Sequence, residues 1–167
     1  ALKYGFKHST GDYITFLDAD MDLHPKLIRN FLPYLSSADI VIGSKRHPFS
    51  KVNYPFIRKV LSKAFRIYSQ IVLGVGLRDT QSGFKVMKRQ ALEVLMPQVV
   101  VKRYAFDLEL MFLAQKHGFR TVEAPIHLNY QHRFKSGIDL SSIRGMFLDV
   151  LAIRYRYSLK KHYQKKY

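Results

Sequence analysis

The sequence predicts an α/β fold, and three observations support this. Short apolar runs alternate along the chain with longer segments of helical periodicity. The short runs are apolar at consecutive positions, as expected for strands that helices cover on both faces. The 167 residues are 47% hydrophobic, which suits one packed domain and argues against disorder. We therefore expect a sheet flanked by helices.

The first half of the chain supplies two strands and a helix. Residues 13–17 are almost wholly apolar and run into the acidic letters DAD, which favours a buried strand ending in a polar turn. A helix should begin at Pro25, because proline suits the first helical turn and apolar residues then recur on one face. Residues 40–42 form the second strand.

The second half continues the alternation. It predicts a long amphipathic helix over residues 55–73, a short strand in GFKVMKR and a helix over residues 106–117. Residues 121–130 alternate apolar and polar side chains, which indicates one half-buried strand, and Pro125 argues for a sheet edge. A last helix is expected from Ser141 onward.

Composition narrows the function classes. The absence of cysteine excludes disulfides and thiolate metal sites, and no apolar run approaches the ~18 residues that span a bilayer. Lys and Arg number 28 against 12 Asp and Glu, a formal charge of +16. Such a charge attracts nucleic acid, anionic lipid or phosphorylated substrates, without choosing among them.

The acidic segment after the first strand is the first candidate site. Asp18 and Asp20 stand where open α/β sheets bind ligands, beyond the carboxyl end of a strand. Two carboxylates there suit Mg²⁺ or Mn²⁺ shared with substrate phosphates. The alternative is that they are turn and cap residues before the Pro25 helix. Asp22 either adds outer charge or caps that helix.

Cations and hydroxyls follow on the next two elements. Lys45 and Arg46 come directly after the second strand. Four polar residues then share one face of the long helix: Arg58, Ser62, Arg66 and Ser69. These residues either form a solvated surface or line a track for anions.

Two further acidic segments carry less specific signals. Asp79, in LRDTQSGFKV, is explained equally well by an Asx-turn or by a site. Asp107 and Glu109 open a predicted helix, where they would favour the positive end of its dipole whatever else they do.

Four collinear segments resemble family 2 glycosyltransferases of the GT-A fold: GDYITFLDAD, IVIGSKR, LRDTQSGFKVMKR and FDLELMFLAQKHGFRTVEAPI. The most similar branch comprises the dolichyl- or polyprenyl-phosphate sugar synthases, which load mannose or glucose onto the lipid phosphate. The resemblance runs from about Gly11 to Arg156. The family's first strand, which reads like V-V-I-P-x-Y-N-E, has no counterpart before Asp12. The resemblance therefore implies a GT-A sheet lacking its N-terminal third, and a chain that is inactive by itself.

The resemblance implies roles for individual residues. Asp18 and Asp20 match the metal-binding Asp-x-Asp motif, which binds Mg²⁺ or Mn²⁺, and Asp79 matches the acidic residue of the active-site loop. Four residues match positions that meet donor or acceptor phosphate: Arg46, Arg58, Ser62 and Arg133. Arg133 would belong to a loop that closes over the phosphates, although KSGID here replaces the usual G-x-S-K ending.

The implied reaction is inverting transfer of a hexose from UDP-glucose or GDP-mannose to a polyprenyl or dolichyl phosphate. A phosphate monoester has its second pKa near ~6 and needs no strong base. We therefore expect Asp79 to orient groups rather than remove a proton. Residues 1–139 would be the C-terminal two-thirds of the catalytic domain.

Residues 140–167 would form a basic amphipathic helix and tail. The segment from Gln131 to Tyr167 contains nine Lys and Arg and two Asp, which gives a net charge of +7. Apolar and tyrosine side chains are interspersed among them. This pattern is typical of a helix lying on an anionic membrane, here the cytoplasmic face, with no nucleic acid as partner. A core-packed helix with a solvated tail is the alternative.

Two rival functions stay open. A family 2 transferase that uses a sugar hydroxyl as acceptor would need a general base, with Asp107 or Glu109 as candidates. A basic nucleic-acid-binding module would explain the charge, but the chain contains no recognised nucleic-acid motif. A processive polysaccharide synthase would require a Q-x-x-R-W motif, and this chain has no Trp.

Overall fold

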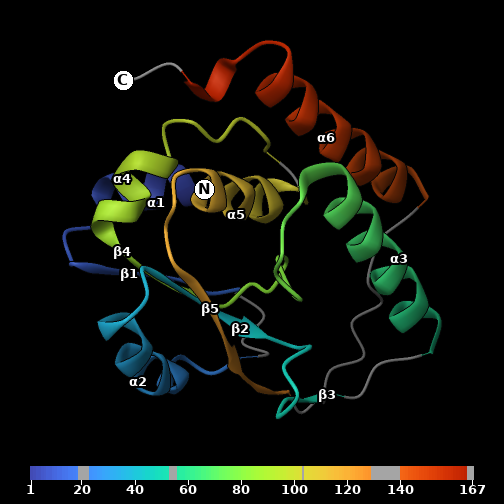
Figure 1. Ribbon diagram of the computed structural model, residues 1–167. Helices are drawn as coiled ribbons and strands as arrows, with labels where there is room; N and C mark the ends of the chain where they lie inside the picture. The colour runs from blue at the N-terminus through green and yellow to red at the C-terminus, as the bar shows by residue number, and fades with distance from the viewer. Residues whose placement is uncertain (19–22, 53–55, 103, 129–139, 165–167) are drawn as a thin grey trace.

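The computed structural model describes residues 1–18, 23–52, 56–102, 104–128 and 140–164 (Figure 1). Its main sheet has the strand order β1-β4-β2-β5. The bounds of these strands are Tyr13–Phe16 for β1, Lys85–Lys88 for β4, Ile40–Ser44 for β2 and Thr121–Pro125 for β5. The alternation of strands and helices confirms the predicted α/β class.

The sheet is mixed. β4 pairs antiparallel with β1 on one side and with β2 on the other, whereas β2 and β5 are parallel. β5 lies at one end of the described sheet, as Pro125 predicted. A second, two-stranded parallel sheet joins β3, Lys51–Val52, to β6, His127–Leu128.

Helices cover both faces of the sheet, as Figure 1 shows. The longer helices are α3, Phe56–Leu73, α5, Phe106–Lys116, and α6, Leu140–Ser158. Shorter helical segments are α1, Leu2–His8, η1, Pro25–Leu27, α2, Ile28–Phe31, η2, Leu32–Ser36, α4, Arg89–Leu95, and η3, His162–Gln164. α3 and α6 lie side by side, and the Tyr68 hydroxyl of α3 donates to the Phe147 carbonyl of α6 at 3.1 Å.

Alternate side chains of the strands build two separate cores. Ile14, Ile40 and Met87 pack into the cluster that contains α5, α4 and parts of α3 and α6. Val41 and Val86, one residue along, pack on the opposite face with the α2 region. Lys85 follows the period of the first set, so its side chain enters the α5 side of the core and is fully buried there.

Two predicted elements are divided in the structure. The helix expected from Pro25 is a series of short segments, η1, α2 and η2, because Pro33 within it has no N–H to continue the hydrogen-bond ladder. The strand expected over residues 121–130 is split into β5 and β6, and Ile126 between them bonds to the loop before β3. α4 and β3 were not predicted.

The exposed side of α3 is more apolar than its sequence pattern predicted. Val60, Leu61, Ile67 and Ile71 are exposed, whereas the helix buries Phe65, Ser69 and Leu73. α6 likewise exposes Leu148, Leu151 and Tyr155 while burying Val150 and Ile153. Within the described ranges, no helix is both long enough and apolar enough to cross a bilayer.

Candidate active site

The Asp-x-Asp segment meets the LRDTQSGFKV loop at the end of β1. Continuing the antiparallel register of β1 and β4 by two residues places Asp18 opposite Gly83. A Cβ added at Gly83 would overlap the Asp18 carboxylate, so only glycine leaves room for that side chain. The carboxylate is a hard oxygen donor of the kind that Mg²⁺ and Mn²⁺ prefer. Asp20 and Asp22 lie outside the described residues, and within the described ranges no cluster of three such ligands forms.

Asp79 ties the loop to the end of β2. Its Oδ2 accepts the Lys45 backbone N–H at 2.9 Å, and its Oδ1 accepts the Gln81 N–H at 3.3 Å. Glu123 of β5 fixes the same loop, because its carboxylate accepts the backbone N–H groups of Arg78 at 3.2 Å and Asp79 at 2.8 Å. With both oxygens accepting backbone donors, Asp79 holds the loop against the end of β2.

A cationic pocket lies between this loop and α3. Arg46 donates a short hydrogen bond from Nη2 to the Ser62 hydroxyl, which joins the end of β2 to α3. The pocket is lined by Arg46, Ser62, Phe65, Arg66, Ser69, Arg78, Asp79, Thr80 and Gln81. The structure therefore brings together three of the predicted positions, Arg46, Ser62 and Asp79.

Two further residues, Arg58 and Arg133, are predicted to bind phosphate. Arg58 belongs to the first turn of α3, two turns before Arg66, and the placement of its side chain lies outside what the structure describes. Arg133 lies outside the described residues altogether. Both assignments remain predictions.

A partly buried ion pair lies next to the loop that contains Gly83. Lys85 Nζ lies 2.7 Å from Asp107 Oδ1, and the Lys85 side chain is fully buried whereas that of Asp107 is 26% exposed. Lys85 Nζ also donates to the Ser82 carbonyl, next to Gly83. The pair thereby places a partly exposed carboxylate from the first turn of α5 near the loop that contacts Asp18.

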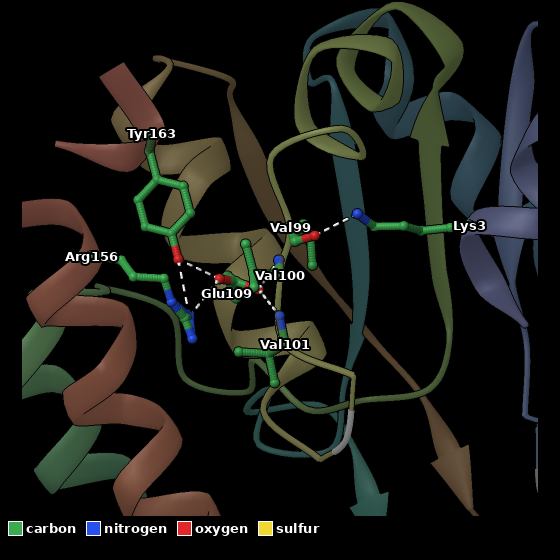
Figure 2. Close-up of polar contacts among 7 residues, drawn as sticks. All are labelled: Lys3, Val99, Val100, Val101, Glu109, Arg156 and Tyr163. Atoms are coloured by element: carbon green, nitrogen blue, oxygen red, sulfur yellow. Dashed lines mark hydrogen bonds and ion pairs between the residues drawn. The ribbon is translucent and has the colours of Figure 1, made fainter. Parts of the chain in front are cut away.

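Glu109 has a different environment, although it is only two residues further along α5 (Figure 2). It is fully buried, and one of its oxygens accepts the backbone N–H groups of Val100 and Val101, each at 2.7 Å. Its other oxygen accepts the Tyr163 hydroxyl and Arg156 Nη1, the latter at 3.4 Å. These internal donors occupy the carboxylate, so the expectation that Glu109 is a candidate general base is wrong.

The Glu109 contacts fasten the C-terminal end of the described chain to α5. Burial, and next the hydrogen bond and negative charge of Glu109, raise the pKa of Tyr163 far above its usual range, against the opposing charge of Arg156. Tyr163 is therefore a neutral hydrogen-bond donor. Its ring lies over α5, and Arg156 of α6 reaches the same carboxylate (Figure 2).

The sequence interpretation missed three residues of this region: Lys85, Glu123 and Tyr163. Lys85 interrupts an apolar run in GFKVMKR, which is a weak signal, whereas Glu123 occupies an ordinary polar position in the alternation of its strand and gave none. Tyr163 gave none, because it stands in a basic tail and its partner is 54 residues away.

Curated relatives give the first comparison. The chain is 32% identical over 174 aligned residues to the Dictyostelium discoideum protein named dolichyl-phosphate beta-glucosyltransferase, and the match covers 95% of this chain and 51% of that protein. It is 35% identical over 137 residues to the polyprenol monophosphomannose synthase of Mycolicibacterium smegmatis, covering 80% and 52% respectively. The chain spans about half the length of these relatives.

A solved structure gives the second comparison. The fold is similar to that of glucosyl-3-phosphoglycerate synthase from Mycobacterium tuberculosis in complex with Mn²⁺, UDP-glucose and phosphoglyceric acid. The TM-score is 0.63 at 16% identity, and the match covers 99% of this chain and 54% of that one. At this identity the likeness establishes the fold, and it confirms the predicted GT-A architecture.

The third comparison is with sequence families. Residues 1–96, which are 96 of the 167, match the family described as Glycosyl transferase family 2. The match includes the DAD, GSKR and DTQSGFK segments on which the resemblance was based. The chain belongs to glycosyl transferase family 2.

Proposed function

We propose that the complete protein transfers a hexose, glucose or mannose, from a nucleotide sugar to a polyprenyl or dolichyl phosphate. The observation that carries this proposal is the cationic pocket lined by Arg46, Arg66 and Arg78. Gln81, which also lines this pocket, lies two residues before Gly83, the contact of Asp18. The pocket suits an anionic acceptor brought beside an anionic donor. The names of the two curated relatives support hexose transfer to such a lipid. Family membership argues against the nucleic-acid-binding alternative.

The donor diphosphate is expected at Asp18 and Asp20. Asp18 offers a carboxylate at the strand end, and the similar solved structure contains Mn²⁺ together with UDP-glucose. A divalent ion held there would neutralise the charge that develops on the leaving nucleoside diphosphate. The proposed metal is Mg²⁺ or Mn²⁺, and the proposed donor is UDP-glucose or GDP-mannose.

The acceptor phosphate supplies the nucleophile. One of its oxygens attacks the anomeric carbon, the bond from that carbon to the diphosphate oxygen breaks, and the nucleoside diphosphate leaves with the electron pair. The dianion carries no proton that must be removed, which agrees with an Asp79 whose two oxygens accept backbone N–H groups. Arg46, Arg58, Ser62 and Arg133 have the task of holding two anions in line.

The surface of α3 and α6 supports a peripheral contact with an anionic membrane. Both helices expose apolar side chains, among them Ile71 and Leu151, and residues 131–167 carry a net charge of +7. Apolar burial and attraction to anionic headgroups act together on such a surface. We assign this contact to the cytoplasmic face, with residues 1–139 as the catalytic part and residues 140–167 as the membrane-facing part.

A second candidate function is transfer to a sugar hydroxyl. It is favoured by Asp107, whose partly exposed carboxylate comes from α5 near the Asp18 side of the site. A hydroxyl nucleophile would need such a base, whereas a phosphate nucleophile would not.

A transfer assay on the complete protein distinguishes the two. It offers polyprenyl phosphate and simple sugars as acceptors between pH 6 and pH 9, with UDP-glucose and GDP-mannose as donors. We expect glycosylated polyprenyl phosphate as the product and loss of transfer in Asp18→Asn. Any decrease in the transfer rate of Asp107→Asn should be the same at pH 6 and at pH 9. Preference for a sugar hydroxyl with strict dependence on Asp107 would overturn the lipid-phosphate proposal. The 167-residue chain by itself is expected to show little turnover, which remains a prediction.

A further inference from the structure

Lys85 carries a positive charge into an apolar part of the sheet. In the strand register it lies opposite Phe16 of β1 on one side and Ile42 of β2 on the other, and its side chain is fully buried. Removing a charge from water is costly even when the charge is paired, and apolar side chains can often replace a buried ion pair with no loss of stability. Stability alone therefore does not account for a lysine at this position.

The ammonium group of Lys85 holds one particular peptide group of the loop before β4. Besides contacting Asp107 Oδ1 at 2.7 Å, Lys85 Nζ donates to the carbonyl of Ser82. Ser82 is fully buried, and a buried carbonyl needs an internal donor. Because a peptide group is planar, holding the Ser82 oxygen also orients the N–H and the Cα of Gly83.

The Asp18 carboxylate lies against this same peptide group. It occupies the place where a Cβ at Gly83 would be, so it packs directly on the Gly83 backbone. Asp18 is otherwise exposed, which makes the Gly83 backbone a surface that limits where the carboxylate can lie. A change in the orientation of the Ser82–Gly83 peptide would therefore change the direction in which Asp18 presents its oxygens.

Asp107 depends less on Lys85 than Lys85 depends on Asp107. The Asp107 carboxylate is 26% exposed and belongs to the first turn of α5, where the helix dipole favours a negative charge. The Lys85 side chain has no exposed surface on which water could hydrate its charge. Asp107 thus compensates the buried cation, and the cation holds the loop.

We infer that Lys85 is a positioning residue of the candidate active site, which fixes the Ser82–Gly83 peptide and thereby the orientation in which Asp18 presents its carboxylate to a divalent cation. The inference rests on the proposed function, from which it takes the metal-binding role of Asp18. It adds a residue that acts through the backbone and touches neither the metal nor the substrates. Removing a group that orients a metal ligand lowers metal affinity about tenfold to a hundredfold.

The test measures Mn²⁺ binding by the complete protein with electron paramagnetic resonance, in the presence of UDP and of GDP. Lys85→Met removes the ammonium group and keeps an unbranched side chain. We expect the Mn²⁺ affinity to fall about tenfold in a protein whose circular dichroism is that of the wild type. Lys85→Arg keeps the charge and the donors, and should bind Mn²⁺ more tightly than Lys85→Met. Wild-type Mn²⁺ affinity in Lys85→Met, or its failure to fold, would overturn the inference.

Asp107→Asn separates positioning from a purely structural role. This variant keeps an oxygen that can accept from Lys85, so it should retain more Mn²⁺ affinity than Lys85→Met. It should nevertheless be the less stable of the two in urea, because it leaves the buried cation without a counter-charge. A purely structural role predicts the same order for stability and for Mn²⁺ affinity, and that result would overturn the inference.

Lys88→Met is the matched control on the same strand. Lys88 also forms an ion pair, with Asp39 at 3.1 Å, but it lies at the end of β4 away from Gly83. The same substitution there should leave the Mn²⁺ affinity unchanged. An equal loss of affinity in Lys88→Met and Lys85→Met would overturn the inference.

The transfer assay keeps the inference and the proposed function apart. In Lys85→Met, transfer should be slow at low Mn²⁺ and should recover in part as the Mn²⁺ concentration rises, while the KM for polyprenyl phosphate stays constant. If the acceptor is a sugar hydroxyl but Mn²⁺ affinity still depends on Lys85, the proposed function fails and the inference stands. If lipid is glycosylated but the complete wild-type protein binds no Mn²⁺, the inference fails and the lipid acceptor stands.

Discussion

Gly83 and Asp18 compete for the same space, and this contact sets the geometry of the candidate metal site. We predict that Gly83→Ala abolishes transfer in the complete protein, because the new methyl group displaces the Asp18 carboxylate. Mn²⁺ binding, followed by electron paramagnetic resonance, should weaken in parallel. Circular dichroism should show that the fold survives, since Gly83 lies in a loop.

The matched control is Gly76→Ala. No atom outside its immediate neighbours lies near the site of a Cβ at Gly76, so this variant should keep activity and Mn²⁺ affinity. Wild-type Mn²⁺ binding in Gly83→Ala would contradict the assignment of Asp18 to the metal.

Asp79 shows how one carboxylate can hold a loop against the end of a sheet. It joins the chain after β2 to the loop that carries Gln81, and Glu123 of β5 holds that loop from the other side. These hydrogen bonds attach the loop to the end of β2 and to β5, so the two strands determine where Arg78 and Gly83 lie. This accounts for an acidic residue in the lining of the cationic pocket.

At the scale of elements, the Lys85–Asp107 pair links β4 to α5. We predict that Asp107→Asn destabilises the protein more than Lys85→Met. The first change leaves a fully buried cation without its partner, at a cost of about 3 kcal/mol, whereas the second leaves a carboxylate that is 26% exposed and still hydrated. Urea unfolding of the complete protein should show this order of midpoints.

The Lys88–Asp39 pair is the control for that comparison. Both of its side chains are about one-third exposed, at 32% and 31%, so Lys88→Met should cost less than about 1 kcal/mol. A Lys85→Met variant that is less stable than Asp107→Asn would contradict the role of burial.

The stability that the contact between α6, η3 and α5 contributes should depend on pH in the alkaline range. The pKa of Tyr163 is raised in the folded state by burial and by Glu109, so the folded protein holds this proton after the unfolded chain has released it near pH ~10. Its contribution to stability is complete below that pH and decreases as the pH rises further. We predict that Tyr163→Phe is less stable at neutral pH and loses less stability between pH 9 and pH 11 than the wild type.

Urea unfolding at pH 9, 10 and 11 measures this difference. Tyr155→Phe alters an exposed tyrosine of α6 and serves as the control. An equal pH dependence in the wild type and in Tyr163→Phe would show that the hydroxyl bonded to Glu109 is not the group responsible.

At the scale of the whole molecule, α3 and α6 present one candidate surface for a membrane. These 167 residues contain no cysteine, so a single Leu151→Cys, with any cysteine elsewhere in the complete protein replaced, can carry an environment-sensitive dye. We predict a blue shift of its emission on vesicles with anionic lipid, a smaller one on zwitterionic vesicles, and a reduction by salt. A dye at Arg29→Cys, on α2, should not respond, and a response there equal to that at Leu151 would contradict a specific surface.

Local sequence signals were sufficient for most elements. Apolar runs placed β1, β2 and β4, helical periodicity placed α3 and α5, and Pro125 placed β5 at an edge, because each signal acts within a few residues of the backbone that it shapes. The helix expected from Pro25 failed because Pro33 interrupts its hydrogen bonds. The motif DAD with DTQSGFK pointed to the family, which the comparison confirmed.

The sequence by itself thus determined the α/β class, the family and the approximate positions of the candidate ligands. Only the tertiary structure decided which of these residues meet. The contacts of Asp18 with Gly83, of Arg46 with Ser62 and of Glu109 with Tyr163 join segments 16 to 65 residues apart. Such pairings depend on strand order and helix packing, which no local sequence pattern records. The same packing leaves Asp107 partly exposed near the site and buries Glu109, two residues further along α5.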